Sequence, residues 1–295
     1  MTVSQPAQNR ALWQLIAGQF LIGSVGVFVH EAGQDAITTV FYRCLFGAMF
    51  LSVWAHFAGQ LRGVWRDRRL LLGAVCSGVL LVLSWVSLFA GMARASIGVA
   101  TMLFHCYPFV MLILAALVLR ERTRLADWGW TALAFLGLLG SANPQRLLAE
   151  LSSNYSTGIA LTLLAGVLCG ASLLLSRQIS KQRAVAVVFI QCCTGIVMLA
   201  AFANSSVMHA GNHWFWLVGL GVIHSGLSYV LCYTAYRHLA VATIAVLSFI
   251  YPLVALRLDY FVYGQLFNAV QLGGLGLIVV GTLGVSLKWG RRAER

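Results

Sequence analysis

The chain has 295 residues, of which 60% are hydrophobic and 9% are charged. Soluble domains carry about 25% charged residues, so this composition excludes a soluble protein and indicates a bilayer. The net charge of +12 does not indicate a nucleic-acid partner, because the basic residues lie in short loops between apolar runs.

Ten apolar runs are each long enough, at roughly 20 residues, to cross a hydrocarbon core about 30 Å thick. They lie near residues 11–29, 37–57, 70–92, 96–119, 125–142, 157–176, 184–203, 214–236, 241–262 and 268–288. The linkers are too short to hold a soluble domain. The predicted fold is therefore an all-α membrane protein with ten transmembrane helices.

Basic residues predict the orientation, because Lys and Arg accumulate in cytoplasmic loops. Arg10 and the loops 62–69, 120–124, 177–183 and 288–295 carry 15 of them on one side, and three, at Arg94, Arg146 and Arg237, are assigned to the other. We expect both termini in the cytoplasm. An even number of crossings is then required, and ten satisfies this.

The chain repeats itself. Tyr107-Pro108 returns 144 residues later as Tyr251-Pro252, and the same shift superimposes, without a gap, Ser84 on Ser228 and Gly129, Gly137 and Gly140 on Gly273, Gly281 and Gly284. A shift of 148 superimposes Phe41, Arg43, Cys44 and Gly47 on Phe189, Gln191, Cys192 and Gly195. These matches predict a duplication, with repeats at residues 1–147 and 148–295. Because five crossings are an odd number, the second repeat must be inverted relative to the first.

The two prolines predict where the repeats meet. Proline removes a helical hydrogen bond and kinks the axis, which a membrane tolerates where the defect faces protein or a water-filled cavity. Matching defects in two inverted repeats are typical of a transporter's binding site. We expect the faces that carry Pro108 and Pro252 to line a central cavity, opened to either side by alternating access.

Polar and aromatic residues near these prolines are candidate substrate contacts, since rings and a few hydrogen-bonding groups suit an amphipathic solute. Helix packing is the alternative for each. The candidates are Gln19, Arg43, Ser84, Trp85, His105, Tyr107, Pro108, Gln191, His224, Ser228, Tyr229, Phe249, Tyr251 and Pro252.

Arg43 has three possible roles: to attract an anionic group in the cavity, to pair with Glu31 or Asp35 at the outer mouth, or to extend to the lipid headgroups. No Asp or Glu is expected at mid-membrane, where proton pumps usually place one. We therefore predict facilitated or exchange transport, or coupling through histidine, rather than carboxylate-based antiport.

The sequence does not favour an enzyme. It has no HExxH motif and no paired acids in a span. Its seven cysteines lie in apolar runs without CxxC spacing, so we expect neither a disulfide framework nor a metal site, and no cofactor. A channel stays open as an alternative and would show conductance without counterflow.

The chain has two five-span halves, an Arg within Phe41-Tyr42-Arg43, a Pro midway along the fourth and ninth spans, and Gly-rich fifth and tenth spans. In these features it resembles the EamA-type branch of the drug/metabolite transporter superfamily. The resemblance covers nearly the whole chain. One departure is Gln265, where the family pattern has Glu.

Within that branch the chain is most similar to the YddG-type aromatic amino acid exporters of bacterial inner membranes. The resemblance implies an inner-membrane secondary transporter that exports aromatic and other amphipathic amino acids. The residues themselves support only an amphipathic solute, so export of drugs, nucleobases or other small metabolites stays open. We expect membrane lipid to surround the chain. The sequence leaves the oligomeric state open, and a monomer is among the states that fit.

Overall fold

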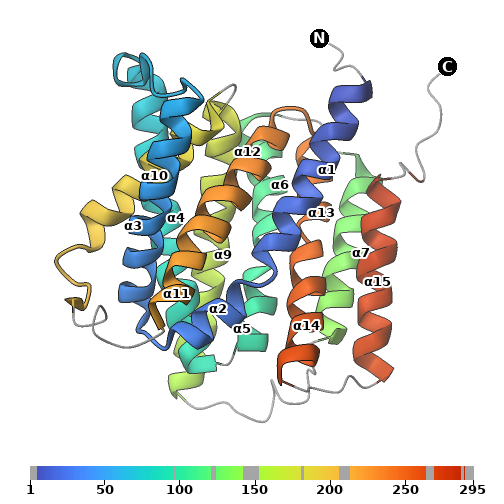
Figure 1. Ribbon diagram of the computed structural model, residues 1–295. Helices are drawn as coiled ribbons and strands as arrows, with labels where there is room; N and C mark the ends of the chain where they lie inside the picture. Colours follow the sequence, from blue (N-terminus) through green and yellow to red (C-terminus); the bar gives the residue numbers. More distant parts are fainter. Residues whose placement is uncertain are drawn as a thin grey trace.

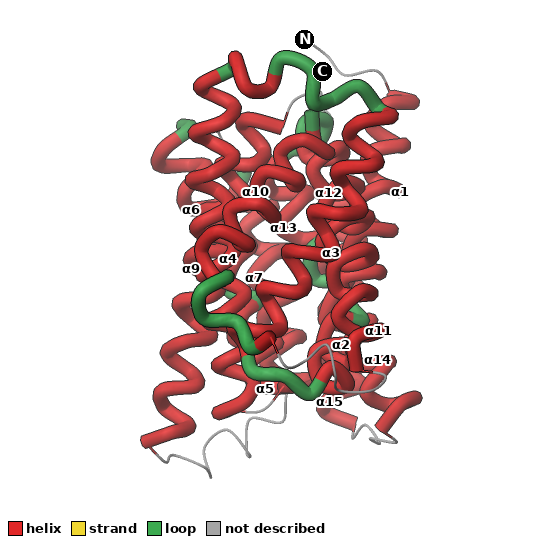
Figure 2. Tube along the Cα trace, turned by 60° about the vertical axis from the view of Figure 1, so that its left-hand side comes forward, coloured by secondary structure: helices red, strands yellow, loops and turns green. Residues whose placement is uncertain are grey.

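The computed structural model describes residues 5–95, 97–120, 124–141, 153–180, 183–205, 213–263, 269–286 and 289. Within these stretches every regular element is a helix, and the helices run side by side between two ends that carry the loops (Figures 1 and 2). Gln265 lies outside the described residues.

The first half contains α1 (Gln5–Ile22), α2 (Val25–Ala32), α3 (Ala36–Phe57), the 3-10 turn η1 (Val64–Arg66), α4 (Arg68–Ala95), α5 (Ile97–Phe104), α6 (Tyr107–Val118) and α7 (Leu125–Ser141). The second half contains α9 (Ser153–Ser180), α10 (Ala184–Leu199), α11 (His213–Gly219), the π-helix η3 (Leu220–Leu227), α12 (Ser228–Tyr236), α13 (Val241–Leu247), α14 (Ile250–Tyr263) and α15 (Ala269–Ser286). Every range in which a span is predicted holds one of these helices or a run of consecutive ones.

Five described helices are long and apolar enough to cross a membrane: Pro6–Ala32, Ala36–Phe57, Arg68–Ala95, Asn154–Ser180 and His213–Tyr236. Shorter apolar helices of 10–17 residues cover Tyr107–Val118, Leu125–Leu139, Ala184–Leu199, Val241–Ala255 and Leu272–Gly281.

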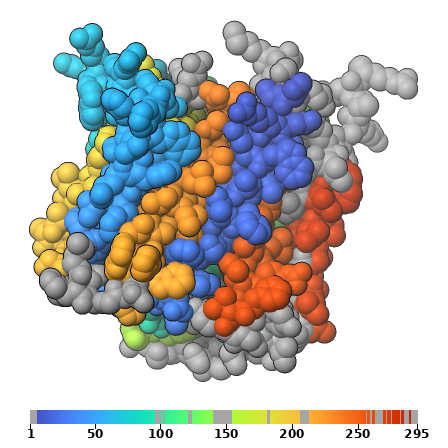
Figure 3. Space-filling view, in the orientation of Figure 1, coloured from blue at the N-terminus to red at the C-terminus, as the bar shows by residue number. Residues whose placement is uncertain are grey.

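The outer surface is apolar and the interior holds polar groups. Phe57 is 84% exposed and Val197 is 82% exposed, whereas Gln19, His105 and Gln191 are almost completely buried. Figure 3 shows one such outer face, where α1 and α3 flank the α11–α12 segment. Monomeric soluble proteins rarely expose large apolar patches, so this surface suits contact with lipid.

Both Tyr-Pro dipeptides coincide with a break between helices, which confirms the predicted defects. α5 ends at Phe104, and Pro108 lies in the first turn of α6. The ring of a proline clashes with the carbonyl four residues earlier, which for Pro108 is that of Phe104. In the second half α13 ends at Leu247 and α14 begins at Ile250. The defects are therefore full interruptions, larger than the predicted kinks.

Two further irregularities are not predicted by the sequence. α1 and α2 are separated at Gly23 and Ser24, and η3 is a π-helix in the middle of the α11–α12 segment. Such π-helical turns are rare and frequently occur at functional sites. Ser24 Oγ lies 2.9 Å from Nε2 of His224, so the two irregular segments touch each other.

Contacts between α3 and α10 are reciprocal. A Cβ placed on Gly47 would meet Cys192 Sγ at 3.2 Å, and a Cβ placed on Gly195 would meet Cys44 Sγ. The shift of 148 carries Gly47 onto Gly195 and Cys44 onto Cys192, so each contact is the counterpart of the other. Reciprocity of this kind is the mark of an interface with twofold symmetry.

The glycine-rich helices α7 and α15, which lie side by side in Figure 1, follow the same rule. Gly137 packs on the backbone of Gly274, and Gly281 packs on the backbone of Trp130. The shift of 144 exchanges these contacts in turn. Small residues allow such close approach where lipid gives no hydrophobic drive for helix association.

α1 begins and α15 ends at the same end of the bundle, the upper end in Figure 1. Arg177, which follows the sixth predicted crossing, donates to the backbone oxygens of Tyr236 and Leu239, at 3.3 and 3.1 Å. The assignment of Arg237 to the opposite side is therefore wrong. Its loop follows the eighth predicted crossing, an even number, so the chain has returned to the side of its termini.

Candidate functional site

Residues from both halves line one cavity at the level of the helix breaks: Gln19 and Ile22 of α1, Phe104 and Tyr107 at the α5–α6 break, Cys169 and Leu173 of α9, Tyr229, Cys232 and Tyr236 of α12, and Tyr251 of α14. Its volume is about 30 Å³. Pockets that bind small molecules measure about 300–1,000 Å³, so the cavity is closed to solute in this conformation.

The two prolines do not line this cavity, although both are buried. The tyrosine that precedes each of them, Tyr107 or Tyr251, lines it instead. The expectation that the prolines form the cavity wall is therefore corrected: the residue before each proline lies in the wall. The prolines interrupt the helices, and the interruption brings the tyrosines to the cavity.

Gln19 is the only amide among the residues that line the cavity. Its Nε2 lies 3.4 Å from Ser248 Oγ, at the α13–α14 break. Its Oε1 is buried and has no hydrogen-bond partner in the part of the chain that the structure describes. The cavity therefore contains an acceptor to which no described residue donates.

His105 occupies the α5–α6 break beside the cavity wall. Its ring centroid lies 4.7 Å from that of Tyr251, 5.5 Å from that of Tyr107 and 6.0 Å from that of Phe249. Nδ1 lies 2.6 Å from the carbonyl oxygen of Thr101, so the neutral ring donates from Nδ1. Nε2 is then an acceptor, and among the described residues it has no partner.

Trp85 and Tyr229, which the shift of 144 superimposes, contact each other. Trp85 Nε1 donates to the Tyr229 hydroxyl at 3.1 Å, with the rings edge to face and their centroids 5.5 Å apart. Two residues at corresponding positions of the halves are therefore in direct contact.

The guanidinium of Arg43 lies over the Trp85 ring, with Cζ 4.0 Å from the ring centroid. Nε donates to Ser225 Oγ at 2.7 Å, and Nη2 donates to the carbonyl oxygen of His224 at 3.4 Å. Arg43 is 2% exposed. Extension of its side chain to the lipid headgroups is therefore wrong.

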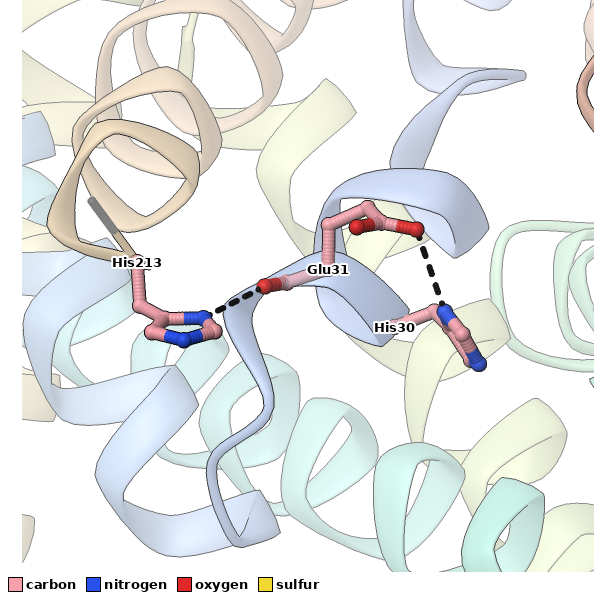
Figure 4. A network of polar contacts seen from close by, with 3 residues as sticks. All are labelled: His30, Glu31 and His213. Carbon is pink, nitrogen blue, oxygen red and sulfur yellow. Dashed lines mark hydrogen bonds and ion pairs between the residues drawn. The ribbon is translucent and has the colours of Figure 1, made fainter. Parts of the chain in front are cut away.

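The predicted pairing of Arg43 with outer-loop acids is wrong too. Asp35 caps α3 and accepts from the backbone N–H groups of Ile37 and Thr38, each at 3.0 Å. Glu31 contacts His30, with Oε1 3.3 Å from Nδ1, and its carbonyl oxygen lies 3.0 Å from Nδ1 of His213 (Figure 4). This network joins α2 to α11.

Gln191 stabilises the contact between the halves. Its Nε2 donates to the hydroxyls of Ser77 and Ser176 at 2.8 and 2.9 Å, and its Oε1 accepts from Tyr233 at 3.1 Å. Its bond to Ser77 mirrors that of Arg43 to Ser225, because the shift of 148 carries one pair onto the other. Gln191 has no place in the cavity wall.

Three other candidates also bind the protein itself. Ser84 donates to the carbonyl oxygen of Ala165 at 2.7 Å, and Ser228 donates to that of Ile223 at 2.7 Å. His224 contacts Ser24 through Nε2 and the carbonyl of Gly219 through Nδ1, at 2.9 and 3.3 Å. The Ser84 bond and the Ser24–His224 contact join separate helices, and the other two lie within the α11–α12 segment.

Six residues of the cavity wall are absent from the predicted set: Ile22, Phe104, Cys169, Leu173, Cys232 and Tyr236. Cys232 and Tyr236 follow Tyr229 by three and seven residues, which places all three on one helical face. That spacing would have found them. The apolar members carry no signal that separates a cavity wall from a core.

Comparison with known proteins agrees with this architecture. The sequence profile of the EamA-like transporter family matches residues 9–142 and 156–287. The uncharacterized transporter YxxF of Bacillus subtilis is 26% identical over 285 residues, which cover 95% of this chain and 90% of that one. An uncharacterized transporter of Archaeoglobus fulgidus is 28% identical over 270 residues, which cover 91% and 93%.

The pseudopaline exporter CntI of Pseudomonas aeruginosa is 24% identical over 276 residues, which cover 92% of this chain and 94% of that one. One crystal structure has the same fold, with a TM-score of 0.81, 17% identity and coverage of 97% of this chain and 99% of that chain. The chain therefore belongs to the EamA-like transporter family, within the drug/metabolite transporter superfamily of multi-pass membrane proteins.

Proposed function

We propose that this chain is a secondary transporter of the bacterial inner membrane that exports amphipathic amino acids, aromatic ones among them, by alternating access. Ten crossings form two inverted repeats, residues 1–147 and 148–295, with both termini in the cytoplasm. The chain moves its solute across the membrane and leaves it chemically unchanged.

Three observations support the inverted repeats. The family profile matches each half separately. The α3–α10 and α7–α15 contacts are reciprocal, as twofold symmetry requires. α1 begins and α15 ends at one end of the bundle, as an even number of crossings requires.

The cavity carries the proposal for the solute. Tyr107, Tyr229, Tyr236 and Tyr251 supply apolar rings with hydroxyls, and Gln19 supplies an acceptor that has no donor among the described residues. A solute with an aromatic or aliphatic part and an ammonium group matches these surfaces, because rings stack on its apolar part while the acceptor takes an N–H. Similarity to CntI, an exporter, supports the outward direction.

The narrow cavity supports alternating access. A solute enters only after helices on one side separate, and the closed state prevents a continuous pore. At the end opposite the termini, α2 holds α11 and η3 through Phe28, whose ring centroid lies 5.0 Å from that of Trp216 and 4.7 Å from that of His224. This contact joins the two halves and is a candidate for the outer closure.

The test is counterflow in proteoliposomes of purified protein, with a panel of amino acids, a nucleobase and a hydrophobic cation. Phenylalanine and tyrosine should exchange with saturation, and the last two compounds should not. Gln19→Leu, which removes the unpaired acceptor, should lower exchange about tenfold, the value of one hydrogen bond. Gln14→Leu, on the same helix but outside the cavity wall, is the control. Exchange of the nucleobase alone would refute the amino acid assignment.

Energy coupling is tested with the same vesicles. We expect facilitated or exchange transport, or coupling through His105 or His224. An imposed pH gradient is applied to the wild type and to the variant that lacks both histidines. Strong acceleration by the gradient that survives their replacement would refute this expectation.

A further inference from the structure

Arg43 is a buried cation whose partners are all neutral. Of the five N–H groups of a guanidinium, the bonds to Ser225 Oγ and to the His224 carbonyl use two. The other three have no acceptor among the described residues. Ser225 accepts from Arg43, and its own O–H has no acceptor there either. Four donors therefore gather around one uncompensated positive charge.

In the part of the chain that the structure describes, no carboxylate offsets that charge. Among the described residues, the titratable groups that interact electrostatically with Arg43 are Tyr229, Tyr251, Cys44, Cys169, Cys192 and His224. Phenols and thiols are mostly neutral near pH 7 and a histidine is neutral or cationic, so none of them supplies a negative charge. A buried cation without a counter-charge is unfavourable, and an arriving anion with good geometry is correspondingly favoured.

Trp85 connects this cation to the cavity. One face of its ring contacts the guanidinium, and its Nε1 donates to Tyr229, which lines the cavity. If the Trp85–Tyr229 hydrogen bond opens and the indole turns aside, the free N–H groups face the cavity. The cover is a single side chain with one hydrogen bond, so a bound solute can displace it.

We propose that Arg43 is the binding site for a carboxylate of the exported solute, covered by Trp85 in the closed state. This site rests on the proposed function and narrows the substrate class to amphipathic carboxylic acids. A planar guanidinium matches a carboxylate through two parallel N–H···O bonds. The site offers one positive charge, that of Arg43, and one hydroxyl donor, that of Ser225. It therefore matches the single negative charge of a carboxylate better than the two negative charges of a phosphate monoester.

Binding is measured first, with radiolabelled phenylacetate and phenylacetamide on protein in phosphatidylcholine vesicles. The wild type should bind the acid about 10- to 100-fold more tightly than the amide, the usual value of a charged hydrogen bond. Arg43→Gln should reduce the preference to about threefold or less, and Arg43→Lys, which keeps the charge, should retain more of it than Arg43→Gln does.

Equal binding of acid and amide by the wild type overturns the site, whether or not the variants fold. A preference that survives in Arg43→Gln, or a Lys variant as unselective as the Gln variant, also overturns it. Added phosphatidylglycerol should not change phenylacetate binding. If phosphatidylglycerol instead competes with phenylacetate for binding, the site belongs to a lipid headgroup.

Efflux of L-phenylalanine and of L-phenylalaninamide then separates this inference from the proposed function. Phenylacetate binding through Arg43 without export of any amino acid overturns the function and leaves the site. Export of the acid and the amide at equal rates overturns the site and leaves the function. Preferred export of the acid, lost in Arg43→Gln, supports both.

Discussion

Gly137→Ala tests the close approach of α7 to α15. A Cβ at this position would lie 2.5 Å from the backbone oxygen of Gly274, 2.8 Å from Cβ of Leu277 and 2.9 Å from the backbone nitrogen of Ile278. Two of these atoms are backbone, and the third is bonded to it. No change of rotamer relieves the contacts, so the helices themselves must move apart.

The size of the effect follows from those distances. A carbon atom approaches a carbonyl oxygen to about 3.3 Å, so the helices must separate by roughly 0.8 Å. Overpacking of this kind costs about 1–3 kcal/mol. Alanine recovers about 0.5–1 kcal/mol over glycine in a helix. We expect Gly137→Ala to lower the free energy of unfolding by up to about 2.5 kcal/mol, and to be about 1–3 kcal/mol less stable than a variant with the same gain in propensity and no clash.

The matched control is Gly129→Ala on the same helix, where a Cβ would meet no atom within 4 Å. It gains the helix propensity without the clash, so the difference between the two variants isolates the packing of α7 on α15. Reversible unfolding in mixed micelles measures both. Equal stability of the two variants would refute the interface. Export should survive in both, because neither helix lines the cavity.

Three further predictions use the same assays. His105→Phe places in the first half the residue that the second half has at Phe249. It removes an acceptor that has no partner among the described residues, and it also removes the Nδ1 bond to the Thr101 carbonyl, so the two effects on stability oppose each other and the net change should stay within about 1 kcal/mol. Export should fall about tenfold, and unchanged export would show that His105 takes no part in transport. Asp35→Ala removes the cap of α3 and should cost about 1 kcal/mol, whereas Asp35→Asn should be nearly neutral. Trp85→Ala should cost about 3–5 kcal/mol, and Trp13→Ala, at a side chain that is 71% exposed, should not measurably change the unfolding transition.

The helices and the proline breaks could be predicted from the sequence, because apolar runs and prolines act locally. The break at Gly23 and Ser24 and the π-helix η3 could not. Neither contains a proline, and the two are tied together through Ser24 and His224, which are 200 residues apart. Irregularities that depend on such a long-range contact leave no pattern in the local sequence.

The candidate site was predictable where repetition and polarity coincide. Tyr107 and Tyr251, which repeat, line the cavity, as do Gln19 and Tyr229. Ser84 and Ser228 were singled out because they repeat, but both hydroxyls bind helix carbonyls. Repetition marks positions that the fold requires, and it does not separate helix contacts from solute contacts.

The symmetry fails at three of the candidate solute contacts, although Tyr107 and Tyr251, which line the cavity, correspond and are identical. Arg43 corresponds to Gln191, Trp85 to Tyr229 and His105 to Phe249, whereas the packing glycines 137 and 281 are identical. An asymmetric solute on an exact twofold axis would have two equivalent orientations. Because the charge of Arg43 and the acceptor of His105 occur in one half only, these orientations differ in energy, and one of them is selected. Divergence of the repeats at these positions is therefore expected of a transporter that holds an amphipathic solute in one direction while its helices exchange conformations around it.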